Sequence, residues 1–373
     1  MKPLPPSTQA LLQAVLPSEI DRQALERWLA TTNLERLEPG QFHLLPLVYR
    51  QMEQTAVNHP WLPRLKGIHR RTWVSNQLAV RAARETLDLL AAADIPALLI
   101  GAVALALTVY ADPTTRPIGA PQVLTRTSDR LAAIQTLTAG GWQPSPPTNV
   151  LTAPCYERWQ AGHLFTKRLS ENEALQVRLC WHAAPSGPIP AWGAQWFNRS
   201  APLTGESLQA RTLDPTDQLF QSLAAAPALE LIPLVDGQQL INRHPIDWTR
   251  FVRLAKDSRL TLMLRERLAL MQTMSASQLP DRVLTELNHA ISPDYADEAW
   301  RLDQLNPWER TAWQRFRLSY ALFRQRAAAQ GVAPYPGAFY DYLRTQMGTN
   351  SLAETLKRGL RRMTASPPLP HGY

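Results

Sequence analysis

Apolar residues recur at helical spacing through the first ninety residues of the chain. Segments 8–15, 19–31 and 42–56 each place apolar side chains three or four positions apart, which predicts a series of short helices. Residues 75–92 show the clearest pattern, because Leu78, Val80, Leu87 and Leu90 fall within a stretch rich in Ala, Leu and Arg. We therefore expect a helical N-terminal region that packs onto the segment after residue 92.

The pattern changes after Asp94. Residues 95–100 form a short, nearly continuous apolar run that ends at Gly101, which is typical of a buried strand. Residues 102–110 predict an apolar helix and residues 112–117 a loop. A second short strand at 123–124 and a second helix over 129–139 come next. Strands and short helices therefore alternate in this part of the chain.

Residues 152–181 resemble an antiparallel hairpin or meander. Within 175–180, Leu and Val alternate with Gln, Arg and Cys, so one face should point inward and the other outward. Helical patterns return over 214–226, 233–242, 247–257 and 262–274, and again from residue 308 onward. The patterns predict an α+β fold, in which a small mixed β-sheet at 93–205 is flanked by helical regions at 1–92 and 206–365. The proline-rich tail at 366–373 is expected to be disordered.

Composition narrows the class of protein. The 373 residues contain no apolar run of the roughly 18 residues that a membrane span needs, and the N-terminus lacks a signal-peptide core, so we predict a cytoplasmic protein. Two cysteines cannot form a disulfide framework. The net charge of +8 is compatible with nucleic acid, nucleotides or an acidic protein surface as partners. At Lys357, Arg358, Arg361 and Arg362 we favour a solvated helix face over a nucleic-acid patch.

Several short motifs succeed one another in a recognisable order. Residues 95–124 contain Ile-Pro-Ala-Leu-Leu-Ile-Gly, then Tyr-Ala-Asp, then Arg-Pro-Ile-Gly-Ala-Pro-Gln-Val-Leu. This order resembles the uncharacterised bacterial nucleotidyltransferase family of the polymerase-beta-like superfamily, which has Gly-Ile-Pro, Leu-Lys-Gly, Tyr-x-Asp and Arg-Pro-x-Gly-Asp-x-Asp-x-Leu. Residues 177–181 match its Val-Asp-Leu-His-Trp strand, and 213–219, 234–236 and 246–248 match its helical half. The resemblance implies a nucleotidyltransferase-like core at 93–205.

The resemblance also implies where a metal site would lie. Two carboxylates two positions apart on a strand point to one face, and a third from a neighbouring strand completes a magnesium site. In this chain the matching positions are Ala120, Gln122 and Arg178, and none is acidic. Ile100 and Cys180 stand where the family has lysine and histidine. We therefore expect ordinary two-metal transfer to be lost and predict no cofactor.

Other acids near these positions are the basis of an alternative enzyme hypothesis, in which magnesium and a nucleoside triphosphate would bind. No two of them lie two apart on a strand beside Gly119, which disfavours this hypothesis. The acids are Asp112, Asp129, Glu157, Glu171 and Glu173.

A phosphate-binding remnant is a further hypothesis that the resemblance supports. In the family, a strand followed by glycine and a helix of small residues presents backbone N–H groups to phosphates. Gly101, Ala102 and Gly119 keep small residues here, and Arg178 could supply the positive charge that a metal once supplied. Packing of an apolar helix explains the same small residues equally well, and Arg178 is also explained as an outward-facing strand residue.

Two further groups of residues have structural interpretations that we favour. Cys155, His163, Cys180 and His182 match no known zinc spacing, so we assign them no metal or catalytic role. Aromatic residues at near-helical intervals form a stripe that docks within the chain or meets another protein, and we favour docking. The stripe consists of Trp308, Trp313, Phe316, Tyr320 and Phe323.

The sequence leaves three functions open. The first is a catalytically inactive nucleotidyltransferase-like protein that binds a protein partner, a nucleotide or another anion. The second is an active nucleotidyltransferase that moves a nucleoside monophosphate group to a small molecule or protein. The third is a basic nucleic-acid-binding protein, which a dispersed distribution of basic residues would weaken.

Overall fold

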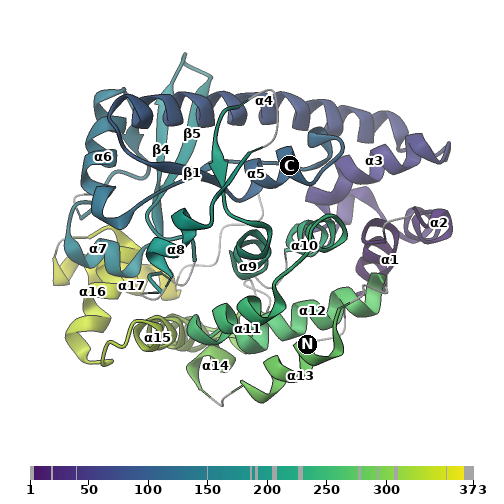
Figure 1. Cartoon of the computed structure of the whole chain (residues 1–373). Helices are drawn as coiled ribbons and strands as arrows, with labels where there is room; N and C mark the ends of the chain where they lie inside the picture. The colour runs from purple at the N-terminus through teal and green to yellow at the C-terminus, as the bar shows by residue number, and fades with distance from the viewer. Residues whose placement is uncertain are drawn as a thin grey trace.

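The computed structural model describes residues 4–17, 20–38, 40–148, 150–184, 187–189, 192–203, 208–225, 230–275, 279–291, 294–305, 310–349 and 351–364. These residues form an α+β fold with a small mixed sheet between helical regions, which confirms the predicted fold class (Figure 1). The tail at 366–373 lies outside the described residues. No helix among the described residues is long and apolar enough to cross a membrane.

The N-terminal region is a series of helices that ends in one long helix. Its elements are α1 (Pro6–Val15), α2 (Arg22–Thr31), η1 (Leu34–Arg36), η2 (Phe42–Leu44), α3 (Leu45–Gln54) and α4 (Leu62–Ala92). Helix α4 begins at Leu62, well before the predicted start at residue 75. Gly67 and a run of polar residues obscure the apolar period there, while packing against α3 stabilises the first turns.

The sheet has five strands in the order β1-β2-β5-β4-β3. Only β2 and β5 are paired in parallel, and the other three pairings are antiparallel. The strands are β1 (Ala97–Ile100), β2 (Gln122–Thr125), β3 (Gln143–Pro144), β4 (Gly162–Arg168) and β5 (Ala174–Cys180). The connecting elements are α5 (Ala102–Thr108), η3 (Pro113–Thr115), η4 (Thr127–Asp129), α6 (Arg130–Ala139) and α7 (Pro154–Trp159). The hairpin expected over 152–181 is formed by β4 and β5 alone, because helix α7 occupies the start of this segment. The sequence did not predict α7, since six residues are too few to show a helical period.

Two hydrophobic cores lie on opposite faces of the sheet. On one face, Val123, Val177 and Leu179 pack with α4 and α6, and α4 crosses this face in Figure 1. On the other face, Leu98 and Leu124 pack with helices of the C-terminal half. Cys180 belongs to this second core and is 3% exposed, so the expectation that it faces outward is wrong. The face of β5 that was expected to point outward is therefore buried at Cys180, in the core that Leu98 and Leu124 also join.

The C-terminal half contains nine helices among its described residues, together with the short strands β6 (Ala201–Pro202) and β7 (Arg211–Thr212) and the preceding helix α8 (Gly193–Asn198). These helices are α9 (Pro215–Ala225), α10 (Ile232–Arg243), α11 (Trp248–Asp257), α12 (Thr261–Ser275), α13 (Asp281–His289), α14 (Tyr295–Asp303), α15 (Ala312–Ala329), α16 (Pro336–Met347) and α17 (Leu352–Thr364). Helices α9 and α10 lie beside the sheet, on the side away from α4 (Figure 1).

The aromatic stripe on α15 is divided between two environments. Phe323 is fully buried and packs against Trp159 of α7, so this part docks within the chain as expected. Trp313, Phe316 and Tyr320 are stacked in a row but remain exposed. Trp308 lies outside the described residues. The expectation that the stripe docks within the chain therefore applies to its C-terminal end.

Candidate functional site

Gln122 and Arg178 lie side by side on neighbouring strands. The parallel register between β2 and β5 pairs Gln122 with Arg178, and the antiparallel register between β1 and β2 pairs Gln122 with Ile100. The Arg178 backbone N–H donates to the Pro121 carbonyl at 2.8 Å, and Pro121 stands between Ala120 and Gln122. The three positions that the resemblance assigns to metal-binding acids therefore meet at the start of β2.

The Gln122 side chain covers the glycine turn after β1. Gly101 has φ +67°, and a Cβ atom placed there would lie 3.1 Å from both Cδ and Nε2 of Gln122. Gln221 of α9 donates from its Nε2 to Gln122 Oε1 at 3.2 Å. A packed pair of neutral amides thus occupies the position that a carboxylate would need for metal binding.

A cavity of about 650 Å³ opens beside this turn. Its walls come from the sheet, α4, α9 and α10, and Gly101, Ala102, Gly119 and Gln122 all line it. Arg178 is exposed on the strand beside Gln122 and is not among the lining residues. The volume falls within the usual range of about 300–1,000 Å³ for small-molecule pockets. Three of the four residues of the hypothetical phosphate site are therefore brought to one cavity, and the fourth lies on the neighbouring strand.

One of the cavity's acids, Asp236 of α10, is part of a buried cluster. Arg116 donates to it from Nε at 3.1 Å and from Nη2 at 2.6 Å, and the Tyr110 hydroxyl donates at 2.7 Å. Burial and the neighbouring Asp236 carboxylate raise the pKa of Tyr110 well above its ordinary value. Burial lowers the pKa of Arg116, but the Asp236 charge outweighs this and raises it overall. Asp236 is therefore a structural ion-pair partner.

The second acid of the cavity, Glu230, is also paired. His43 Nδ1 lies 3.3 Å from Glu230 Oε2, and this hydrogen bond lowers the pKa of Glu230. Within the described ranges, no three His, Cys, Asp or Glu side chains are arranged so that they could hold a metal ion. The cavity thus offers cationic and neutral groups, and its two acids already have cationic or imidazole partners.

The acids of the alternative enzyme hypothesis lie away from the cavity lining. Asp112 caps the turn η3 and accepts from the Thr114 N–H at 2.9 Å. Glu157 of α7 pairs with the buried Arg130 at 3.1 Å.

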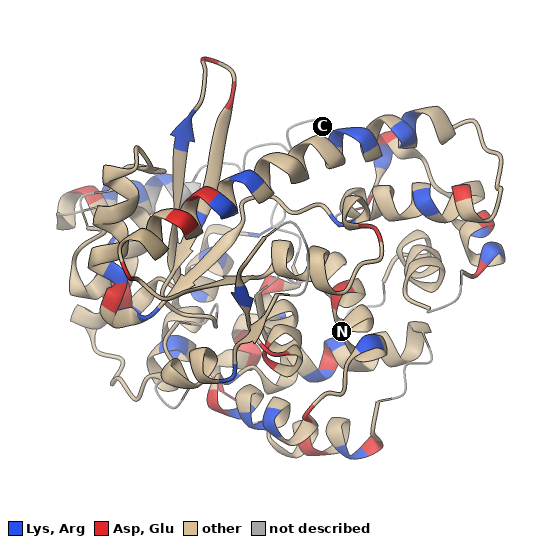
Figure 2. Cartoon of the chain, turned by 45° about the horizontal axis from the view of Figure 1, so that its top comes forward, with Lys and Arg blue, Asp and Glu red and all other residues tan. Residues whose placement is uncertain are grey.

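The remaining three acids are also placed elsewhere. Asp129 precedes α6 and accepts from the Ser128 hydroxyl at 3.0 Å. Glu171 and Glu173 are exposed at the tip of the β4–β5 hairpin, which stands away from the rest of the chain in Figure 2. None of the five lines the cavity beside Gln122.

Arg71 is a residue of the cavity that sequence reasoning missed. It lies on α4 and lines the cavity, and its side chain is exposed. Within the described part of the chain, neither Arg71 nor Arg178 makes a side-chain hydrogen bond or ion pair. Apart from its positive charge, nothing in the sequence indicated that Arg71 faces a cavity, because helix α4 was expected to begin after it, at residue 75. The cavity therefore has a cation available on one wall and a second beside Gln122.

The cysteines and histidines near β5 do not form a reactive group. Burial raises the pKa of Cys180 to about 12 and lowers that of His182 to about 4. His163 is held between the Tyr156 hydroxyl at 2.6 Å and the Pro146 carbonyl at 3.1 Å. These surroundings are those of buried structural side chains.

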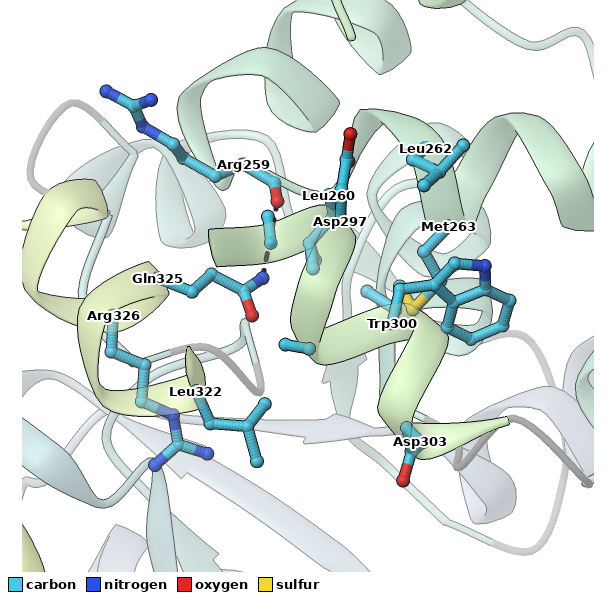
Figure 3. A pocket seen from close by; sticks show the side chains of 13 residues that line it. Arg259, Leu260, Leu262, Met263, Asp297, Trp300, Asp303, Leu322, Gln325 and Arg326 are labelled. Carbon is cyan, nitrogen blue, oxygen red and sulfur yellow. Dashed lines mark hydrogen bonds between the residues drawn. The ribbon is translucent and has the colours of Figure 1, made fainter. Parts of the chain in front are cut away.

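Two other cavities contain none of the positions that the resemblance singles out. One of about 140 Å³ lies between α12, α14 and α15, where Gln325 donates to the Arg259 carbonyl at 3.3 Å (Figure 3). Its volume lies below the range of about 300–1,000 Å³ that is usual for small-molecule pockets. The other, of about 670 Å³, lies at the far ends of β2 and β5 and is lined in part by Arg126, Trp181 and His182. The cavity at Gln122 is therefore the candidate site.

Comparison with known proteins places this geometry in a family. Residues 41–276 match the model of a family described as "Uncharacterised nucleotidyltransferase". A search of curated proteins finds no significant match. The matched residues span α4, the sheet and α9 to α12, and they include every residue that forms the cavity. The chain therefore belongs to this uncharacterised nucleotidyltransferase family.

Proposed function

We propose that this chain is a catalytically inactive nucleotidyltransferase that acts by binding, either of an anionic ligand such as a nucleotide or of a protein partner. The observation that carries the proposal is the pairing of Gln122 with Arg178, at the positions where the family resemblance expects two metal-binding acids. At the third of these positions, Ala120 has a methyl group in place of a carboxylate.

The electrostatics of the cavity support loss of metal-dependent transfer. Magnesium is a hard cation that requires charged oxygen ligands and near-octahedral geometry. The Gln122 amide oxygen already accepts from Gln221, and Arg178 would repel a divalent cation from the adjacent strand position. The remaining acids, Glu230 and Asp236, are engaged by His43 and Arg116.

The same charges favour an anion. Arg71 on the cavity wall and Arg178 beside Gln122 are both exposed and could each form two parallel hydrogen bonds to a phosphate. A ligand bound in this way would not need magnesium. At Gly119, where no heavy atom lies within 4 Å of an added Cβ position, there is room for the ligand to approach the backbone.

Calorimetric titration of ATP and GTP, with and without magnesium, tests the proposal. We expect binding that is independent of magnesium and is lost in Arg71→Ala and Arg178→Ala. Arg168→Ala is the matched control, since Arg168 is exposed on β4 of the same hairpin and should leave binding unchanged.

Other outcomes separate the alternatives. Magnesium-dependent binding, or transfer of a nucleoside monophosphate group that Glu171→Ala, Glu173→Ala or Asp112→Ala abolishes, would establish the enzyme hypothesis instead. If neither nucleotide produces heat, nucleotide binding is excluded and binding of a protein partner remains. Capture with the purified chain and crosslinking at the cavity would then identify that partner.

A further inference from the structure

The net positive charge of the chain is confined to its C-terminal end. Residues 310–373 contain ten Lys or Arg and two Asp or Glu, whereas residues 1–309 contain 29 of each. This end lies beyond residues 41–276, which match the family. The net charge of the chain therefore equals that of its last helices, although residues 62–84 of α4 also carry six Lys or Arg and no Asp or Glu.

The same region exposes large apolar side chains to water. Among the described residues, six of the nine exposed large hydrophobic side chains lie between residues 313 and 356. Two of them, Leu352 and Leu356, are one turn apart on α17, and each is 57% exposed. Because residues four apart share a helix face, α17 presents an apolar stripe to solvent.

A different face attaches α17 to the rest of the protein. Thr355 is buried, and its hydroxyl oxygen lies 2.6 Å from that of Thr349. Gly359 faces Met347 of α16, because a Cβ atom at Gly359 would lie 3.4 Å from the Met347 Cε atom. The helix is therefore docked through small residues, while its two leucines remain on the surface.

Basic side chains accompany these leucines. Lys357, Arg358 and Arg361 are all exposed on α17. Arg358 pairs with Glu354 at 2.7 Å, and both side chains are about half exposed. Arg358 Nη1 also donates to the Met347 carbonyl at 2.7 Å. An exposed ion pair contributes little in water, so Arg358 Nη2 can exchange Glu354 for a phosphate group while Nη1 keeps its bond to Met347. The helix thus combines an apolar stripe with an excess of positive charge.

We propose that α17 docks on an anionic lipid surface, with Leu352 and Leu356 inserted at the headgroup boundary and Lys357, Arg358 and Arg361 contacting lipid phosphates. Basic helices with a leucine face bind such surfaces by adding apolar burial to electrostatic attraction.

The chemistry of the stripe selects lipid over two other partners. Single-stranded nucleic acid stacks its bases on aromatic rings, and the exposed rings of this region, Trp313, Phe316 and Tyr320, lie on α15 and not on α17. A stable protein interface needs roughly 800 Å² from each partner, far more than two leucine side chains supply. A membrane surface needs only a few inserted side chains when charges assist them.

Sedimentation of the full chain with vesicles tests this proposal. We expect binding to phosphatidylcholine vesicles that contain phosphatidylglycerol, little binding to pure phosphatidylcholine, and weakening with added salt. Leu352→Glu with Leu356→Glu should weaken binding by about tenfold or more, because two apolar contacts are lost. Leu131→Ser is the control, since Leu131 is 46% exposed on α6, where the one basic residue, Arg130, is buried and paired with Glu157.

Several results would overturn the proposal. They are absence of vesicle binding, equal binding to neutral vesicles, undiminished binding by the leucine variant, or an equal loss of binding in the Leu131 control. Binding of an oligothymidine that depends on Lys357 but not on the leucines would assign the surface to nucleic acid instead. Melting curves check that the variants fold. If the leucine variant does not fold, Lys357→Glu still tests the proposal, because it should weaken vesicle binding through loss of positive charge alone.

Discussion

Arg116 and Asp236 form a buried ion pair with two hydrogen bonds, which joins the loop before β2 to helix α10. Both residues, with Tyr110, belong to the motifs that carry the family resemblance. Through these contacts the motifs fasten the sheet to the helical half. A protein that no longer binds metal would still need this cluster in order to fold, so its presence is consistent with loss of the acids at positions 120, 122 and 178.

Asp236→Ala is expected to destabilise the protein strongly. The substitution would leave the Arg116 guanidinium buried without its carboxylate, and such a change typically lowers the free energy of unfolding by about 3–5 kcal/mol. Urea denaturation measures the loss. Glu26→Ala is the control, since the exposed Arg22–Glu26 pair should contribute less than about 1 kcal/mol. Equal effects in the two variants would show that the buried cluster does not stabilise the fold.

Restoring the acids should restore metal binding. The triple variant combines Ala120→Asp, Gln122→Asp and Arg178→Asp. Its carboxylates at positions 120 and 122 are two residues apart and the third, at position 178, is on the adjacent strand, which is the arrangement that magnesium requires. We expect heat on titration of magnesium chloride into this variant and none with the wild type. A variant with Arg168→Asp in place of Arg178→Asp has the same charge and should not bind. If both variants bind equally, the three positions do not form one site.

Gly101→Ala and Gly119→Ala should separate backbone strain from steric conflict at the cavity. Both glycines have nearly the same positive φ, +67° and +66°, so both variants incur similar strain of roughly 1 kcal/mol. Only at Gly101 would the new Cβ meet Gln122, at 3.1 Å, whereas nothing lies within 4 Å at Gly119. We therefore expect Gly101→Ala to be the more destabilising in thermal melts. Adding Gln122→Ala should remove the excess, and failure to do so would mean that Gln122 does not cover this turn.

The sequence predicted the fold well wherever one pattern ran uninterrupted. Helix α11 was expected over 247–257 and is found over Trp248–Asp257, because a strong apolar face coincides with an Asp247 cap that accepts from the Arg250 N–H. The first half of α4 and the short α7 were missed, since tertiary packing stabilises helices that local periodicity does not show.

The candidate site was predictable only in part. The motif order identified Gln122 and Arg178 and implied that they stand on neighbouring strands, but their parallel register is seen only in the structure. Arg71 could not be identified, because nothing in residues 62–74 indicates that they line a cavity with residues from 101–122 and 221–236. The pairing of Glu230 with His43 joins residues far apart in sequence, which no local pattern reveals.

Asp217 gives the protein a predictable pH dependence of stability. It is fully buried at the start of α9, beside Asp214, Arg199 and Arg250, and burial with the Asp214 charge raises its pKa to about 7. The folded state therefore keeps a proton on Asp217 up to about pH 7, whereas the unfolded chain releases it near pH 3.8. This contribution is fully present below pH 3.8 and is lost as the pH rises through 7, because the native state binds more protons in that window.

Asp217→Asn removes the titration and should make stability less dependent on pH. As the pH rises from about 4 to about 8, the wild type should lose stability relative to the variant by up to about 4 kcal/mol, at about 1.4 kcal/mol per pKa unit. Denaturation midpoints across this pH range measure the difference, and Asp88→Asn on the exposed face of α4 is the control. A difference that is constant with pH would show that Asp217 is already ionised in the folded protein, paired with Arg199 and Arg250.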